Sequence, residues 1–275
     1  MVPDHNSRVI LCLVYRRIIT ADYGHASVTL RIRQGRRSLA RGAGTPYLCC
    51  MEQTAESVSE IVVGRTVFLE FQENCWLIGH SRTKEAICVD PGGDPAQVVD
   101  LAGQMGLTIK YIANSHGHID HIAGVGGLRR ATGAKVLMHP ADVEMMRLAK
   151  DMGLRFGMQV EDPGQPDALL SDLDDIDIDG LKLKVLHTPG HTQGSISFYI
   201  DGIVFAGDTL FNGSIGRTDL PGGDYDQEMA SICDRLLALP DDTIVLPGHM
   251  DQTTIGHERQ RNPYVRMELA RRAGG

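Results

Sequence analysis

The chain has 275 residues, of which 42% are hydrophobic, so it is long enough for one large domain with a buried core. The formal net charge of −8 is unevenly distributed: residues 1–50 contain eight Arg, no Lys and two Asp, a net of +6, so residues 51–275 carry −14. Because an acidic domain repels phosphates and anionic lipid, we expect neither a nucleic acid nor a membrane as a partner.

The spacing of the cysteines and the length of the apolar runs indicate the cellular compartment of the protein. The six cysteines show no C-x-x-C pair and no spacing typical of a disulfide framework, which indicates reduced thiols in a reducing compartment. The longest apolar run near the N-terminus, residues 9–15, is too short to span a membrane. We therefore expect a cytoplasmic protein.

We predict an irregular N-terminal extension over residues 1–60 and a single domain over residues 61–275. The extension is rich in Arg and almost free of acidic residues, which is typical of an organellar transit segment and would make the protein organellar. The irregular pattern around Pro46 equally favours an unstructured tail. A biological start at Met51 is a third interpretation.

The first part of the domain alternates strands with a helix. Apolar patterns predict strands over residues 67–71, 75–79, 86–89 and 108–113, with a turn at 72–74. Asp94 and Pro95 are a good N-cap and first-turn pair for a helix that ends near Gly106. This order of elements predicts an α/β layered domain.

The strand over residues 108–113 leads into a loop with His116, His118, Asp120 and His121. His116 and His118 are two residues apart in a turn, so both rings can direct a nitrogen at one cation, as zinc and iron sites require. Asp120 and His121 lie at the start of a helix and can face a second cation. A lone loop histidine is more often structural, but four such residues at this spacing predict a site for two metals.

The next elements are expected over residues 122–132 (helix), 135–139 (strand) and 140–152 (helix). The last of these carries Met145, Met146 and Met152 on one face, which we assign to the core. Residues 153–170 contain Pro163 and Pro166 and show no clear period. Long loops commonly shape access to a site, so this stretch is the candidate lid.

The second half is predicted to contain a hairpin over residues 176–186, strands over 195–200, 202–206 and 243–246, and helices over 225–239 and 263–272. Asp90, His191, Asp208 and His249 each follow an apolar strand-like run, as the histidine loop does. Polar residues at strand ends can converge on one edge of a sheet, so we expect these side chains to meet.

We do not expect the remaining histidines to bind a metal. His139 and His187 are predicted to be structural, although His187 lies only four residues before His191. The others are expected at the surface: His5, His25, His80 and His257.

Four motifs carry a family resemblance: H-x-H-x-D-H at residues 116–121, T-P-G-H-T at 188–192, A-G-D-T at 206–209 and P-G-H at 247–249. In this order they resemble the metallo-β-lactamase superfamily, specifically its glyoxalase II-like branch of compact metallo-hydrolases, over about residues 61–262. The resemblance implies an α/β fold of the four-layer αββα type, with a dinuclear site at one edge of the sheets.

The resemblance also implies a ligand set. The first metal is held by His116, His118 and His191, the second by Asp120, His121 and His249; Asp208 bridges both, and Asp90 orients a ligand by a hydrogen bond. The residue types agree, because three neutral imidazoles suit a catalytic zinc and a bridging carboxylate suits two cations about 3.5–4 Å apart. The expected cofactors are two divalent metal ions, zinc first, with iron or manganese as alternatives.

The chemistry expected of this site is hydrolysis. Coordination lowers the pKa of water towards about 7, so a metal-bound hydroxide can attack a thioester such as S-D-lactoylglutathione or a related small acyl thioester. Asp120 is the expected catalytic residue, orienting the hydroxide and accepting its proton. Arg217 is a candidate for binding a substrate carboxylate, or it pairs with Asp219 or Asp224 to fix its loop.

Other functions stay open beside the hydrolase. A mononuclear Fe(II) persulfide dioxygenase is the main alternative, because G-R-T-D at residues 216–219 also resembles those enzymes. A lactonase or β-lactamase is disfavoured, since zinc β-lactamases of the commonest type have Cys at the position of Asp208; a non-enzymatic metal-binding protein is a further alternative. Only 26 residues follow His249, so we do not expect the helical domain with which full glyoxalase II enzymes bind glutathione. The sequence carries no signal for the oligomeric state.

Overall fold

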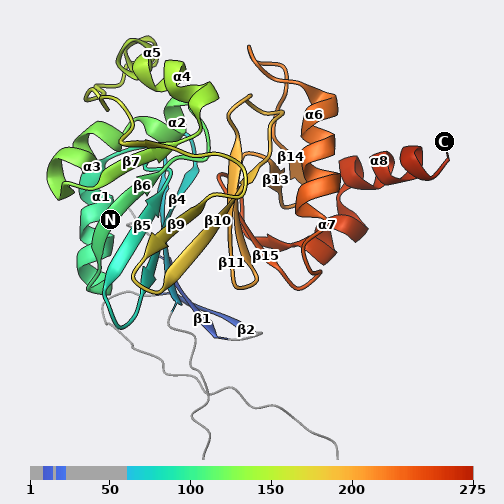
Figure 1. Ribbon diagram of the computed structural model, residues 1–275, viewed down its shortest axis with the longest axis horizontal. Helices are drawn as coiled ribbons and strands as arrows, with labels where there is room; N and C mark the ends of the chain where they lie inside the picture. Colours follow the sequence, from blue (N-terminus) through green and yellow to red (C-terminus); the bar gives the residue numbers. More distant parts are fainter. Residues whose placement is uncertain (1–8, 15–16, 23–60, 275) are drawn as a thin grey trace, which may run out of the picture.

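The computed structural model describes residues 9–14, 17–22 and 61–274. Two β-sheets pack against each other in the middle of the molecule, with one group of helices on each outer side (Figure 1). This is the four-layer αββα sandwich of the α/β class that the sequence predicted.

The first sheet has eight strands in the order β2-β1-β3-β4-β5-β6-β7-β8. Strands β3, β4 and β5 are antiparallel, whereas β5 to β8 run parallel to one another. The bounds are Val9–Val14 (β1), Arg17–Asp22 (β2), Ile61–Phe68 (β3), Glu73–His80 (β4), Glu85–Val89 (β5), Thr108–Ala113 (β6), Lys135–Met138 (β7) and Ala168–Leu169 (β8).

The second sheet has six strands in the order β16-β15-β12-β11-β10-β9, and β13 pairs with β14 beside it. Strand β15 joins β12 in parallel, so the residues that follow these two strands lie at the same edge. The bounds are Asp175–Ile178 (β9), Leu181–His187 (β10), Ile196–Ile200 (β11), Ile203–Gly207 (β12), Leu210–Phe211 (β13), Ser214–Ile215 (β14), Ile244–Pro247 (β15) and Thr253–Thr254 (β16).

The helices fall into two groups, α1 to α5 beside the first sheet and α6 to α8 beside the second (Figure 1). The bounds are Pro95–Met105 (α1), Ile119–Ile122 (α2), Val125–Thr132 (α3), Val143–Arg147 (α4), Ala149–Arg155 (α5), Tyr225–Ala230 (α6), Ile255–Arg261 (α7) and Pro263–Ala273 (α8). A 3₁₀ turn, Pro140–Asp142, precedes α4, and a π-helical segment, Ser231–Leu236, continues α6. None of the described helices has the length and apolar character needed to cross a bilayer.

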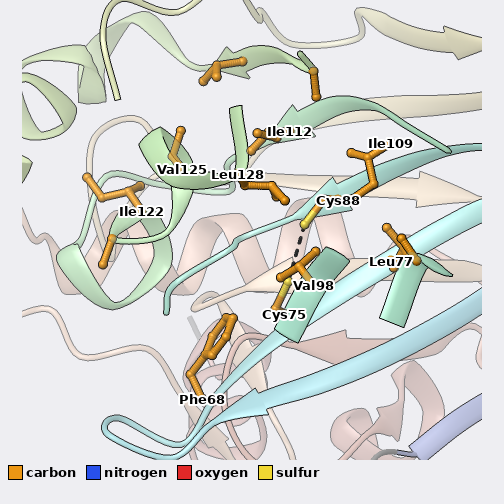
Figure 2. Close-up of a cluster of buried hydrophobic side chains, with 14 of the residues drawn as sticks. Phe68, Cys75, Leu77, Cys88, Val98, Ile109, Ile112, Ile122, Val125 and Leu128 are labelled. Atoms are coloured by element: carbon orange, nitrogen blue, oxygen red, sulfur yellow. Dashed lines mark hydrogen bonds between the residues drawn. The ribbon is translucent and has the colours of Figure 1, made fainter. Parts of the chain in front are cut away.

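The layers enclose three apolar clusters. One lies between the first sheet and α1 to α3, where Cys75 and Cys88 bring their sulfurs within 3.5 Å among Phe68, Val98 and Leu128 (Figure 2). A second lies between the two sheets, and a third between the second sheet and α6 to α8. Cys75, Cys88 and Cys233 are free thiols, as expected.

The helix α1 shows why several sequence predictions hold. Asp94 Oδ1 accepts a hydrogen bond from Ala96 N at 3.0 Å, and Pro95 occupies the first turn, where its missing N–H costs nothing. Gly106 ends the helix in the left-handed conformation, with φ of 64°, which glycine adopts without strain. The hairpin of β9 and β10 is confirmed in the same way, by alternating burial along both strands.

Three element predictions are wrong in detail. The strand expected over residues 67–71 ends at Phe68, and the turn covers residues 69–72. The helix expected over residues 122–132 is divided at Gly124, whose N–H donates to Pro91 O at 2.8 Å; a Cβ there would lie 2.2 Å from Gly93 O. The helix expected over residues 140–152 is broken into the 3₁₀ turn, α4 and α5.

Part of the N-terminal segment joins the first sheet. Strands β1 and β2 form a hairpin, and β1 runs antiparallel to β3, with Val9 opposite Arg65. The three interpretations of residues 1–60 and the boundary at residue 60 stay predictions. His5, His25 and the side chains of Cys12, Cys49 and Cys50 lie outside the described residues.

Candidate metal centre

The polar residues at the strand ends meet at one edge of the two sheets. The loop after β6 supplies the histidine motif, the turn after β10 supplies His191, and the ends of β12 and β15 supply Asp208 and His249. Four groups of ligand atoms among the described residues each lie within 4.8 Å of one another: His116, His118 and His191; His116, His121 and Asp208; Asp120, His121 and His249; and Glu73, Asp90 and His121. The structure thus brings together every residue that the resemblance placed around a metal.

The first group consists of three imidazoles whose nitrogens face one point. His118 Nδ1 lies 3.1 Å from His116 Nε2 and 2.8 Å from His191 Nε2. The outer nitrogen of His191, Nδ1, donates to Arg217 O at 2.7 Å, so its Nε2 carries a lone pair.

The outer nitrogen of His116 is fixed through Ser115. Ser115 Oγ donates to Asp90 Oδ2 at 2.6 Å, so it accepts from His116 Nδ1 at 3.0 Å and leaves His116 Nε2 with a lone pair. A single proton on His118 Nδ1 could be donated to only one of its two neighbours, His116 Nε2 or His191 Nε2. A cation satisfies all three lone pairs, and the three nitrogens therefore fit a metal ion.

Burial keeps this group neutral. The pKa of His116 is well below its ordinary value because the ring is buried and lies beside His121 and His191. Burial and the neighbouring His191 lower the pKa of His118 to about 4. Neutral imidazole is the form that coordinates metals.

The second group, by which we mean Asp120, His121 and His249, lies around the carboxylate of Asp208 and is rich in negative charge. Asp208 Oδ1 lies 3.4 Å from His121 Nε2, and Oδ2 lies 3.6 Å from His191 Nε2 and 3.5 Å from His249 Nε2, so one carboxylate touches both groups. Asp120 Oδ2 lies 3.3 Å from His249 Nε2. Burial alone would raise the pKa of Asp208, but His121 and the other histidines lower it below its ordinary value, so the carboxylate stays ionised.

The pKa of His121 indicates that the second group stabilises positive charge. Burial would lower its pKa, yet Asp208 and Asp120 hold the pKa well above the ordinary value. His121 Nε2 and Asp208 Oδ1 are both buried without a hydrogen-bond partner of good geometry. These groups stabilise positive charge at this point, and a second cation would supply it.

Asp90 lies behind the ligands. Its Oδ2 lies 3.1 Å from His121 Nδ1, and its Oδ1 accepts from Ser115 N at 2.7 Å. With the bond from Ser115 Oγ, this carboxylate orients both His116 and His121. Gln72 O, 3.2 Å from His249 Nδ1, orients that ring in the same manner.

Asp142, which sequence reasoning missed, joins two ligand loops. Its Oδ2 accepts from Gly117 N at 2.9 Å and from Thr192 Oγ1 at 2.7 Å, and its Oδ1 accepts from Gly194 N at 2.8 Å. The residue is 1% exposed. It therefore fixes the loop of His116 and His118 against the loop of His191. Its place in a 3₁₀ turn far from both loops gave no signal in the sequence.

Two further buried carboxyl groups were also missed. Glu73 is fully buried, with Oε1 3.9 Å from His121 Nδ1, and burial raises its pKa well above the ordinary value. Glu228 Oε2 accepts from His191 N at 2.8 Å, and burial raises its pKa as well. Glu228 thus holds the backbone of His191, whereas Glu73 lies beside His121 with both carboxyl oxygens buried and without a hydrogen-bond partner among the described residues. Only the fully packed fold places these two groups there.

The structure agrees with some of the remaining sequence predictions and contradicts others. The Arg217 guanidinium pairs with Asp219, with Nε and Nη2 each 2.8 Å from a carboxylate oxygen, which is the loop-fixing alternative. His139 and His187 stack at 4.3 Å outside the ligand groups, and His257 is exposed. The surface prediction for His80 is wrong: the ring is 1% exposed, and its Nδ1 accepts from Arg82 N and Thr83 N.

A cavity of about 840 Å³ opens from this centre, and its lining corrects two predictions. Met145 and Met152 line the cavity, and of the three methionines assigned to the core only Met146 is fully buried. From residues 153–170 only Phe156 reaches the cavity. The lid prediction is therefore wrong for most of that stretch, because Arg129 binds the carbonyls of Pro163 and Gln165 against α3.

Comparison with known proteins agrees with this geometry. Residues 69–249 match the model of the metallo-beta-lactamase superfamily, and the chain belongs to that superfamily. It is 36% identical over 199 residues to the hydroxyacylglutathione hydrolase GloC of Haemophilus influenzae, which covers 71% of this chain and 93% of that protein.

Two solved structures are similar. The B3 metallo-beta-lactamase BLEG-1 has a TM-score of 0.69 at 34% identity, covering 74% of this chain and 99% of BLEG-1. TTHA1623, solved in a di-iron-bound form, has a TM-score of 0.66 at 35% identity, covering 73% and 98%.

Gly248 gives a first testable prediction. A Cβ at this position would lie 2.3 Å from Asp208 Oδ1 and 2.6 Å from His121 Cε1. We expect Gly248→Ala to displace both side chains and to weaken metal binding about 10–100-fold, the range seen when a supporting group is lost. Competition with a chelator measures this. Gly103→Ala is the matched control, since a Cβ there meets nothing within 4 Å; equal metal affinity in both variants would contradict the prediction.

Proposed function

We propose that the chain is a metal-dependent thioester hydrolase with two metal ions. The observation that carries the proposal is the single carboxylate of Asp208, which touches both ligand groups. His116, His118 and His191 would hold one ion, Asp120, His121 and His249 the other, and Asp208 both. We assign zinc first, with iron or manganese as alternatives; the di-iron form of TTHA1623 supports iron as a candidate.

The bound cations and the side chains of the centre would have different roles in hydrolysis. Bound divalent cations lower the pKa of a coordinated water to about 7 and polarise a carbonyl. Asp120 is the general base that accepts the proton of the attacking water; burial opposes its charge, but His121 and a hydrogen bond with His249 keep its pKa below the ordinary value. The acyl carbon gains oxygen from water, the carbon–sulfur bond breaks, and the thiolate leaves with little need of an acid.

The substrate proposed is a small acyl thioester, with S-D-lactoylglutathione as the first compound to test. The similarity to GloC, named a hydroxyacylglutathione hydrolase, supports this choice. We propose no nucleic acid or membrane partner and a cytoplasmic location. Arg217 stays a candidate for a substrate carboxylate, although its pairing with Asp219 already occupies the guanidinium.

His118→Ala tests the proposal. We expect about two equivalents of metal in the unchanged protein, cleavage of S-D-lactoylglutathione, and loss of both one metal and turnover in the variant, because three nitrogens become two. His257→Ala, at an exposed histidine on α7, is the control and should behave as the unchanged protein.

Other results would select another function. One iron, no thioester cleavage and oxygen uptake with glutathione persulfide would identify an Fe(II) dioxygenase that uses His116, His118 and Asp208. Hydrolysis of a chromogenic cephalosporin in place of the thioester would favour a β-lactamase, the activity for which BLEG-1 is named.

A further inference from the structure

The cavity beside the metal centre determines what a substrate can carry. Its base is formed by ligand residues, among them His118, Asp120 and His249. A volume of about 840 Å³ lies in the range of small-molecule sites. A substrate whose reacting carbonyl reaches the base must lay the rest of its structure against the walls.

The walls are mostly apolar, and outside the proposed ligands and Arg217 the polar side chains among the described lining residues are Gln72 and Ser214. One consists of α4, α5 and the turn before β4, with Met145, Leu148, Met152 and Phe156, and Phe156 meets Phe71 edge to face at 5.8 Å. The opposite wall includes Phe211, Ile215, Leu220 and Pro221. Leu148 is 37% exposed and Phe156 56%, so a ligand can still cover apolar surface here.

The charges of the cavity do not match those of glutathione. An S-acylglutathione carries two carboxylates and one ammonium group, so carboxylates are in excess. Among the described lining residues Arg217 alone carries a permanent positive charge, and Asp219 already pairs with it through two hydrogen bonds. Two carboxylates laid on these walls would lose hydration without gaining a partner.

We infer that the walls bind an uncharged, apolar acyl group, so that the preferred substrates are medium-chain or aromatic acyl thioesters. This inference rests on the proposed thioester hydrolysis and names the substrate class of the same site. The acyl chain lies between α4–α5 and the segment of residues 211–221, and the carbonyl lies at the ligand groups.

A series of thioesters of one neutral thiol, N-acetylcysteamine, tests the inference with the metal-loaded full chain. The acyl groups are acetyl, butyryl, hexanoyl, benzoyl and succinyl. Each buried methylene adds a factor of about three to four in binding, so kcat/KM should rise at least about tenfold from acetyl to hexanoyl. Succinyl should stay at or below acetyl, because its carboxylate meets apolar walls.

A charge placed in the wall gives an independent test. Leu148→Lys should lower kcat/KM for the hexanoyl thioester at least about tenfold and raise it for S-D-lactoylglutathione, whose carboxylates gain a partner. Leu154→Lys is the matched control: Leu154 is exposed on α5 but does not line this cavity, so both values should stay unchanged.

The outcomes separate this inference from the proposed function. Cleavage of the acetyl and lactoyl thioesters without a rise along the series, or equal effects of Leu148→Lys and Leu154→Lys, would overturn the apolar acyl site and leave the hydrolase standing. No cleavage of any thioester by metal-loaded protein would overturn both.

Discussion

Replacing Asp208 with Asn should leave a folded protein that holds about one metal ion and has lost at least about 100-fold in kcat, more than removal of a supporting residue costs. Asn keeps the size of the side chain but replaces an anionic oxygen with an amide that cannot bridge two cations. Three histidine nitrogens lie 3.4–3.6 Å from the Asp208 carboxylate. Removing its charge therefore weakens both ligand groups together.

Metal analysis after dialysis, followed by kcat on S-D-lactoylglutathione, measures the effect of Asp208→Asn. Asp242→Asn, an exposed position before β15, is the matched control and should keep full metal and activity. Two tightly bound metals with kcat intact in Asp208→Asn would show that the carboxylate does not bridge, and the dinuclear assignment would fail. One metal with kcat intact would instead indicate that a single ion is sufficient.

The convergence of the proposed metal ligands could be predicted because each follows a strand or its loop and belongs to a short motif. His116 to His121 occupy one loop, and His191, Asp208 and His249 each come directly after an apolar run. Strand ends at one sheet edge converge, so local spacing was enough to predict that these side chains meet.

The supporting carboxylates could not be predicted in that way. Asp142 acts on residues 25 and 52 positions away, and Glu228 on a residue 37 positions away. Neither carries a local pattern, because its role exists only once the loops have packed. His80 was misassigned for a related reason: an isolated polar residue at a strand end resembles a surface residue until the turn that covers its ring is known.

The interruption of a predicted helix at Gly124 and the burial of the methionine face could not be predicted either, because both depend on contacts with distant parts of the chain. Gly124 divides a periodic segment because the backbone of residues 91–93 approaches it, a contact from another part of the chain. The period of the methionines correctly indicated an apolar face. It could not distinguish a face packed on the core, as at Met146, from one that lines a cavity, as at Met145 and Met152.

Asp142→Ala should destabilise the protein more than any other change outside the ligand set that we consider. The substitution leaves the N–H groups of Gly117 and Gly194 buried without their acceptor, whereas the Thr192 hydroxyl can turn to Ser195 Oγ at 2.8 Å. Each of the two orphaned donors costs about 1–3 kcal/mol, so we expect a loss of roughly 2–6 kcal/mol in the free energy of unfolding. For a domain of this size that corresponds to a fall of about 10 °C in Tm.

The same change should also weaken metal binding, because Gly117 lies between two ligand histidines and Gly194 follows His191 by three residues. Thermal unfolding with and without metal, and chelator competition, separate the two effects. Asp142→Asn retains one acceptor oxygen and should lie between the parent and Asp142→Ala, whereas Asp151→Ala, exposed on α5, should match the parent. If Asp142→Ala lowers Tm in the metal-free protein but leaves metal affinity unchanged, Asp142 stabilises the fold without positioning the ligands; only a fall in both quantities supports the joining of the two loops through this carboxylate.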